Sequence, residues 1–132
     1  MSDGAQNLTG VWNGLYTYPG GMSVAFVATL IEAGSHLSGS IHEPCVAAIC
    51  LSDTMYATLS GSRQGNAVTF IKTYDGAGPD YQNPVAYEGR LNGDATEIEG
   101  RWTIRGLLSG TFLMIRSAGK EETVERKAHE KV

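Results

Sequence analysis

The chain has 132 residues, of which 10 are Lys or Arg and 14 are Asp or Glu, and its net charge is −4. This length fits one domain around a single core. The charge lacks the basic footprint of nucleic-acid or anionic-membrane binding, and no apolar run reaches the roughly eighteen residues of a membrane span, so we expect neither partner. The polar start, MSDGAQN, has no apolar stretch of a secretion signal, and we expect a cytoplasmic protein.

Short runs rich in β-formers, many of them alternating polar and apolar residues, recur along the chain. They cover residues 8–18, 22–33, 36–43, 54–63, 66–74, 84–92, 96–105 and 107–117. No segment before residue 119 has convincing helical spacing of apolar residues. Short strands at regular intervals predict an all-β sandwich or barrel.

A three-residue pattern, an apolar residue followed by any residue and then glycine, recurs in six of these runs. The six are Leu8 to Gly10, Leu37 to Gly39, Leu59 to Gly61, Tyr87 to Gly89, Ile98 to Gly100 and Leu108 to Gly110. Because residues i and i+2 share a face, each glycine removes bulk on the side of its apolar partner, where a sheet must coil inward. An even number of hairpin-linked strands with inward glycines predicts a closed, eight-stranded antiparallel up-and-down barrel.

The connections between the runs differ at the two ends of such a barrel. One end has the short segments AGSH, RQGN and NGD, where glycine can supply the positive φ of a tight turn. The other end has PGG, a short RG link and the long segments PCVAAICLSD and DGAGPDYQNP. Barrels hold ligands in their mouths and binding residues concentrate on long loops, so we expect any site at the long-loop end.

This pattern divides the chain into three parts. They are an N-terminal arm at residues 1–7, a β-barrel domain at 8–118 and a charged flexible tail at 119–132. The tail sequence is charged and lacks apolar periodicity, which favours a solvated tail over a docking helix.

Gly10-Val11-Trp12 on the first strand and Arg116 at the end of the last strand resemble the structural signature of the calycins, which include lipocalins, fatty-acid-binding proteins and avidins. In those barrels a first-strand tryptophan closes one end and a basic side chain from the last strand packs across it. The resemblance implies a structural role for Trp12 and Arg116 near the tight-turn end, where a cation over the indole ring adds stability.

Within the calycins, the strand lengths and turns are most similar to the avidin and streptavidin barrel. GNAVTFIKTY and IEGRW place Phe70 and Trp102 where avidins have ligand-contacting tryptophans. The polar residues with which avidins bind the head group of biotin are not matched, because this sequence has other residue types at those positions. These positions are Gly14, Ile41, Glu43 and Val85. A site built on hydrogen bonds loses orders of magnitude in affinity without them, so we expect no biotin binding.

Nine side chains are predicted to point inward at the long-loop end and to bind a ligand there. They are Tyr16, Tyr18, Ile41, Glu43, Phe70, Lys72, Val85, Trp102 and Ile104. An aromatic and apolar wall with few polar groups is typical of a small-molecule pocket, and also of the filled interior of a small barrel, so both stay open. Glu43 and Lys72 are inward charges that must pair, hydrate or meet a ligand, and we favour an ion pair at the surface rim over catalysis.

The remaining reactive residues indicate no further chemistry. His36, His42 and His129 are scattered, with no second ligand at metal-binding spacing on the same face, so we expect no metal and no other cofactor. Cys45 and Cys50 bracket VAAI in a long connection, and in a cytoplasmic protein we favour reduced thiols over a disulfide. This apolar segment is suited to plugging the mouth, lining a ligand entrance or packing on a neighbouring subunit.

Outward positions of the first and last strands are apolar, although these strands are neighbours in a closed barrel. Val11, Leu15, Leu113 and Ile115 would form one patch, which predicts a subunit interface in a homodimer or homotetramer. Avidin-like barrels commonly assemble in this way, and the resemblance implies the same. The alternative is a set of scattered surface residues, which is normal on any protein.

Three functions remain open. The leading hypothesis is a non-catalytic barrel that binds a small, partly apolar ligand at the long-loop end. An isomerase or cyclase that uses Glu43 and Lys72 as acid and base is the enzymatic alternative, which we disfavour. The third is a structural or interaction module with a filled barrel.

Overall fold

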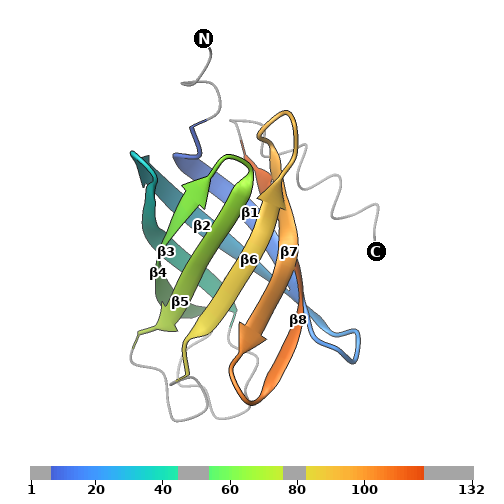
Figure 1. Cartoon of the computed structure of the whole chain (residues 1–132). Helices are drawn as coiled ribbons and strands as arrows, with labels where there is room; N and C mark the ends of the chain where they lie inside the picture. Colours follow the sequence, from blue (N-terminus) through green and yellow to red (C-terminus); the bar gives the residue numbers. More distant parts are fainter. Residues whose placement is uncertain (1–6, 45–53, 76–82, 118–132) are drawn as a thin grey trace.

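The computed structural model describes residues 7–44, 54–75 and 83–117, which contain eight strands (Figure 1). The strands are β1 (Gly10–Thr17), β2 (Ser23–Ala33), β3 (His36–Pro44), β4 (Thr54–Gln64), β5 (Ala67–Tyr74), β6 (Val85–Leu91), β7 (Glu97–Ile104) and β8 (Leu108–Arg116). The described residues include no helix that is long and apolar enough to cross a membrane.

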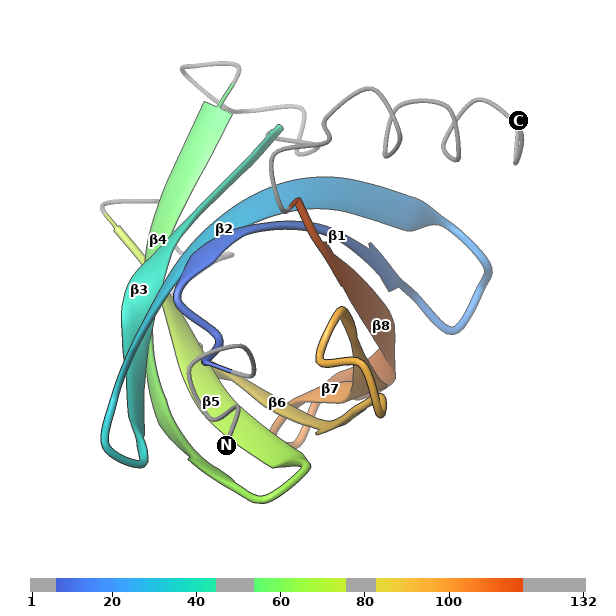
Figure 2. The ribbon, with the colours of Figure 1, turned by 90° about the horizontal axis from the view of Figure 1, so that it is seen from above.

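The strands form a closed barrel in chain order, and every neighbouring pair is antiparallel. The ring is closed by β1 and β8, whose register runs from Trp12 opposite Arg116 to Thr17 opposite Thr111 (Figure 2). The predicted fold class, an eight-stranded antiparallel up-and-down barrel, is confirmed.

Five of the six recurrent glycines, all but Gly10, lie against a backbone carbonyl oxygen of a neighbouring strand. A Cβ atom on Gly61 would overlap the carbonyl oxygen of Thr69, and one on Gly100 would overlap that of Glu88. Gly39 and Gly110 meet backbone carbonyl oxygens in the same way. Side chains at these positions would force the strands apart, so the glycines permit the tight coiling that a small barrel needs.

The tight turns use positive φ at two of the three expected glycines. Gly34 has a φ of 64° and Gly65 a φ of 60°. The expectation for NGD is wrong, because the residue with positive φ there is Ala95, at 59°. The side chain of Asn92 accepts hydrogen bonds from the backbone N–H groups of Thr96 and Glu97, each at 2.9 Å, which holds the chain in this conformation.

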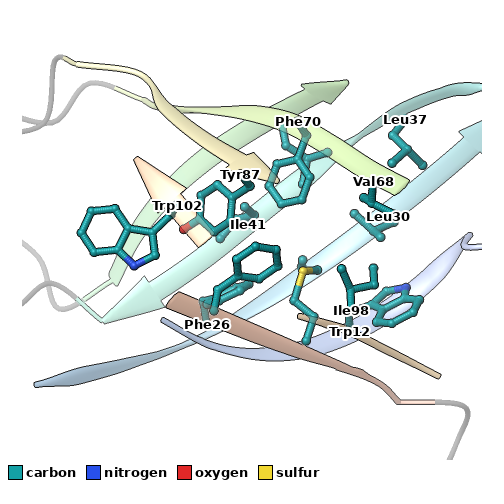
Figure 3. Packing of buried hydrophobic residues seen from close by; sticks show 14 of the residues in the cluster. Trp12, Phe26, Leu30, Leu37, Ile41, Val68, Phe70, Tyr87, Ile98 and Trp102 are labelled. Atoms are coloured by element: carbon teal, nitrogen blue, oxygen red, sulfur yellow. The ribbon is translucent and has the colours of Figure 1, made fainter. Parts of the chain in front are cut away.

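The buried hydrophobic residues pack inside the barrel along its axis (Figure 3). Phe70 and Tyr87 lie opposite each other on β5 and β6, and their rings stack with centroids 4.7 Å apart. The ring of Phe112 meets Tyr87 edge-on at 4.9 Å. Trp12 and Trp102 are both buried, near opposite ends of this column.

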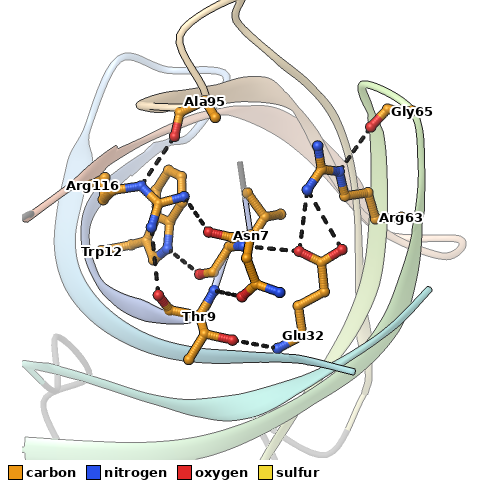
Figure 4. Close-up of polar contacts among 9 residues, drawn as sticks. Asn7, Thr9, Trp12, Glu32, Arg63, Gly65, Ala95 and Arg116 are labelled. Carbon is orange, nitrogen blue, oxygen red and sulfur yellow. Dashed lines mark hydrogen bonds and ion pairs between the residues drawn. The ribbon is translucent and has the colours of Figure 1, made fainter. Parts of the chain in front are cut away.

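Trp12 and Arg116 pack against each other at one end of the barrel (Figure 4). The guanidinium carbon of Arg116 lies 4.7 Å from the Trp12 ring centre, and the guanidinium donates to the carbonyl oxygens of Ala95 at 3.0 Å and Asn7 at 2.7 Å. The indole N–H of Trp12 donates to the Leu8 carbonyl at 2.9 Å. The segment before β1 is therefore tied across this end.

A second polar contact strengthens the same end. A carboxylate oxygen of Glu32 accepts from the backbone N–H of Leu8 at 2.8 Å and from the guanidinium of Arg63 at 3.1 Å (Figure 4). Both side chains are about nine-tenths buried, so the pair is partly shielded from solvent. These contacts occupy this end of the barrel interior.

Candidate functional site

A cavity of about 230 Å³ lies at the end of the barrel opposite Trp12 and Arg116. It is lined by Tyr16, Tyr18, Lys72, Tyr74, Asn83, Val85, Tyr87, Trp102, Ile104, Leu107 and Leu108. This is the end that carries the two long connections, whose residues 45–53 and 76–82 lie outside the described part. Cys45 and Cys50 are among them.

Six of the nine predicted site residues line this cavity. They are Tyr16, Tyr18, Lys72, Val85, Trp102 and Ile104. The other three, Ile41, Glu43 and Phe70, are buried but are not part of the cavity lining. Phe70 instead stacks on Tyr87 in the core, and Glu43 is held by side chains of the cavity wall.

Glu43 is the centre of a buried polar cluster built from three strands. Its Oε1 accepts a hydrogen bond from the Lys72 ammonium at 3.1 Å. Its Oε2 accepts from the hydroxyls of Tyr16 at 2.6 Å and Tyr74 at 2.9 Å. The Tyr16 contact has the length of a charge-assisted O–H···O⁻ bond. Both carboxylate oxygens are thus engaged.

The ion pair of Glu43 and Lys72 forms, but not at the surface rim as expected. The two side chains are only 2% and 1% exposed. Alternation along a strand gives the face of a residue but not its depth, and the surrounding tyrosine rings bury the pair. A buried pair depends on complete hydrogen bonding to offset the cost of desolvating both charges.

Lys72 is enclosed by aromatic rings as well as by the carboxylate. Its Nζ lies 4.5 Å from the ring centre of Tyr74, 4.7 Å from that of Tyr16 and 5.4 Å from that of Tyr87. Burial lowers the pKa of Lys72, while the Glu43 carboxylate opposes that shift. The faces of these aromatic rings carry negative partial charge and stabilise the charged ammonium form of Lys72.

The tyrosines of the cluster stay neutral far into the alkaline range. Burial raises the pKa of Tyr16, Tyr74 and Tyr87 well above its ordinary value, and the nearby Glu43 carboxylate raises it further. Each phenol is therefore a hydrogen-bond donor at neutral pH, rather than a base.

The opposite wall of the cavity is aromatic and offers little polarity. Trp102 makes edge contacts with Tyr18 at 5.2 Å and Tyr16 at 6.0 Å between ring centres. Its indole N–H donates to the Thr17 carbonyl at 3.2 Å. With that donor occupied, Trp102 presents an apolar ring surface to the cavity.

Three polar residues of the lining were missed by the sequence reasoning: Tyr74, Asn83 and Tyr87. The signal for two of them was present, because Tyr74 shares the face of Lys72 two residues earlier and Tyr87 shares the face of Val85. Asn83 precedes β6, where strand alternation makes no prediction.

The predicted interface residues lie on the outside of β1 and β8. Leu15 and Leu113 are direct cross-strand neighbours, and Ile115 is opposite Asn13. Val11 is 43% exposed and Leu15 38%, whereas Leu113 and Ile115 are half-buried. An open groove of about 330 Å³ runs beside Leu15 and Leu113, also lined by Thr17, Glu99, Gly100, Arg101, Thr111 and Phe112.

Other outward apolar side chains were not anticipated. Ile31, Tyr56 and Ile71 are exposed on β2, β4 and β5. His42 lies outward beside Tyr56, with ring centres 6.3 Å apart. Within the described residues, no group of three or more His, Cys, Asp or Glu side chains is arranged to hold a metal ion.

Comparisons with known proteins give the fold alone. No family model and no curated protein matches the chain. Among solved structures, it is similar to a redesigned β-barrel, with a TM-score of 0.65 and 15% identity over 83% of this chain and 90% of the other. It is also similar to a de novo designed fluorescence-activating β-barrel, with a TM-score of 0.61 and 13% identity over 88% of this chain and 99% of the other.

Proposed function

We propose that this protein is a non-catalytic binding barrel that holds a small, planar, largely apolar molecule. The observation that carries the proposal is the cavity of about 230 Å³, with aromatic walls and a polar cluster at Lys72. Ligand sites are typically concave, mostly apolar and equipped with a few placed polar groups. The cavity has that composition and lies in the mouth of a rigid barrel.

The size of the cavity restricts the ligand. Drug-sized molecules occupy sites of about 300–1,000 Å³, and one water takes about 30 Å³ in the liquid. A cavity of about 230 Å³ therefore suits a molecule of one or two rings. The edges and faces of Trp102, Tyr16 and Tyr18 favour a flat aromatic partner through offset or edge-to-face contacts.

The state of Glu43 favours binding over acid–base catalysis. A general base must reach the proton that it abstracts. Glu43 already accepts from Lys72, Tyr16 and Tyr74, and it is not part of the cavity lining. An isomerase or cyclase built on Glu43 and Lys72 would first have to dismantle this cluster.

We propose further that the barrel is of the calycin type without biotin recognition. The Trp12–Arg116 contact at the closed end supports the first part. Gly14 supports the second, because a Cβ at that position would overlap the Phe26 ring and the site has no space for an amide there. At the avidin head-group positions of the third strand, Ile41 is apolar and Glu43 is already paired.

Fluorescence provides the test. In a Trp12→Phe background Trp102 is the remaining tryptophan, and titration with naphthalene derivatives should change its emission saturably. The matched variant adds Ile104→Phe, which places a larger side chain at the half-buried Ile104 position without adding a second indole. This change narrows the cavity and should weaken binding at least tenfold.

Two outcomes would contradict the proposal. An unchanged Trp102 signal across a panel of one- and two-ring compounds, verified by calorimetry, would indicate a filled barrel. Equal affinities of the parent protein and the Ile104→Phe variant would place binding outside the cavity. The filled-barrel module would then be the better account.

A further inference from the structure

Two polar groups in the cavity wall have donors that the described residues leave unused. No hydrogen bond between described residues involves the hydroxyl of Tyr87, which lines the cavity although the residue is only 2% exposed. Lys72 has three N–H donors, and Glu43 is the one hydrogen-bond acceptor that the described residues give it. No buried side-chain nitrogen or oxygen atom of the described residues lacks a partner, so the Tyr87 hydroxyl is accessible from the cavity, where a bound molecule or water can accept its hydrogen bond.

The charged acceptor beside these donors, Glu43, is already engaged. Both oxygens of Glu43 already accept hydrogen bonds, from Lys72 and two tyrosines, and the Trp102 N–H is directed to the Thr17 carbonyl. A ligand oxygen with lone pairs is therefore complementary to this part of the wall, whereas a ligand donor would compete for the engaged carboxylate.

The charge of the cavity wall favours an uncharged ligand acceptor over an anionic one. Lys72 is already neutralised by Glu43 at 3.1 Å, so a ligand carboxylate would bring a second negative charge beside Glu43 in a buried site. A carbonyl oxygen gains the same hydrogen bonds and remains uncharged. The ion pair thus disfavours carboxylates, despite the lysine in the wall.

We propose that the cavity selects uncharged planar molecules with a carbonyl oxygen, and that Tyr87 is the specificity-determining residue that donates a hydrogen bond to this oxygen. The inference rests on the proposed binding function and names the ligand class of that site. Tyr87 is held in place by its stacking on Phe70 and its edge contact with Phe112, so its hydroxyl is positioned before a ligand binds.

The test compares three probes of nearly the same shape by calorimetry. Acetylnaphthalene carries the carbonyl, isopropenylnaphthalene replaces its oxygen by a methylene group, and naphthoate carries a charged carboxylate. We expect the ketone to bind about tenfold more tightly than the alkene, as one well-placed hydrogen bond at a buried donor implies, and naphthoate to bind more weakly than the ketone.

Tyr87→Phe removes the hydroxyl and keeps the stacked ring. Affinity for the ketone should fall about tenfold, to that of the alkene, while affinity for the alkene changes less than about twofold. Tyr56→Phe removes a hydroxyl from the exposed outer face of β4 and should leave the affinities for all three probes unchanged. Infrared spectra of the bound ketone add a readout that needs no variant, because a hydrogen bond lowers the C=O stretching frequency.

Each contrary result has a definite meaning. Equal affinities for ketone and alkene, equal losses for both in Tyr87→Phe, tighter binding of naphthoate, or an unshifted C=O frequency would each overturn the inference while the binding function stands. Failure of all three probes to bind would overturn the proposed function itself.

Discussion

Replacing Lys72 by methionine tests the buried cluster most directly. Methionine keeps an unbranched apolar stem of similar length, so the loss of packing is small. The ammonium disappears, and Oε1 of Glu43 loses its donor at 3.1 Å in a site where the carboxylate side chain is 2% exposed. The carboxylate keeps Tyr16 and Tyr74 as donors.

The expected loss of unfolding free energy follows from this geometry. Removing one partner of a buried pair costs about 3–5 kcal/mol, and the two remaining donors place this case near the lower end, at about 3 kcal/mol. A domain of this size has a total free energy of unfolding of about 5–15 kcal/mol. The variant should therefore still fold, but its unfolding midpoint should lie at a clearly lower urea concentration. The cation–π contacts of Lys72 are part of this loss and are not added to it.

Urea unfolding at neutral pH, followed by tryptophan fluorescence, measures the effect, and the double variant Lys72→Met with Glu43→Gln is its control. Without a stranded charge, the double variant should recover at least half of the lost free energy. A loss below about 1 kcal/mol in the single variant, or a double variant less stable than the single one, would refute the reasoning. Either result would mean that Glu43 reaches solvent.

Three further predictions concern the closed end, the tyrosines and the outer surface. Trp12→Ala should destabilise the protein by about 3–5 kcal/mol in the same urea assay, because a fully buried indole leaves a large void, and a loss below about 1 kcal/mol would place Trp12 outside the core. Since burial raises the pKa of Tyr16, the folded state retains a proton that the unfolded chain loses above about pH 10. Stability should then fall with rising pH, by up to about 1.4 kcal/mol per pH unit for each such tyrosine, and tyrosinate absorbance should appear with unfolding; buried tyrosines that ionise in the folded protein near pH 10 would contradict this. Light scattering should show an oligomer, most simply a two-fold dimer, that Leu113→Lys weakens and the exposed control Thr103→Lys does not; a monomeric wild type, or an oligomer indifferent to Leu113→Lys, would remove the interface from this face.

Much of the barrel is determined locally and is therefore present in the sequence. Strand alternation assigns each side chain to a face, which is why the inward positions of Tyr16, Lys72 and Trp102 were predictable. The recurrent glycines mark where bulk cannot be tolerated, as the contact of Gly61 with Thr69 shows. The glycines let the eight-stranded sheet coil tightly, and closing it into a ring pairs the edge strands β1 and β8 with each other.

Only the tertiary structure decided which inward side chains meet and how deeply they lie. Glu43 joins Tyr16, 27 positions away, and Lys72, 29 positions away, from strands that share no ladder. Such contacts depend on the stagger and tilt of the strands around the closed ring, and alternation carries no information about either. The same geometry turned an expected rim pair into a buried one and left the hydroxyl of Tyr87 facing the cavity, since depth is set by what the opposite wall of the barrel supplies.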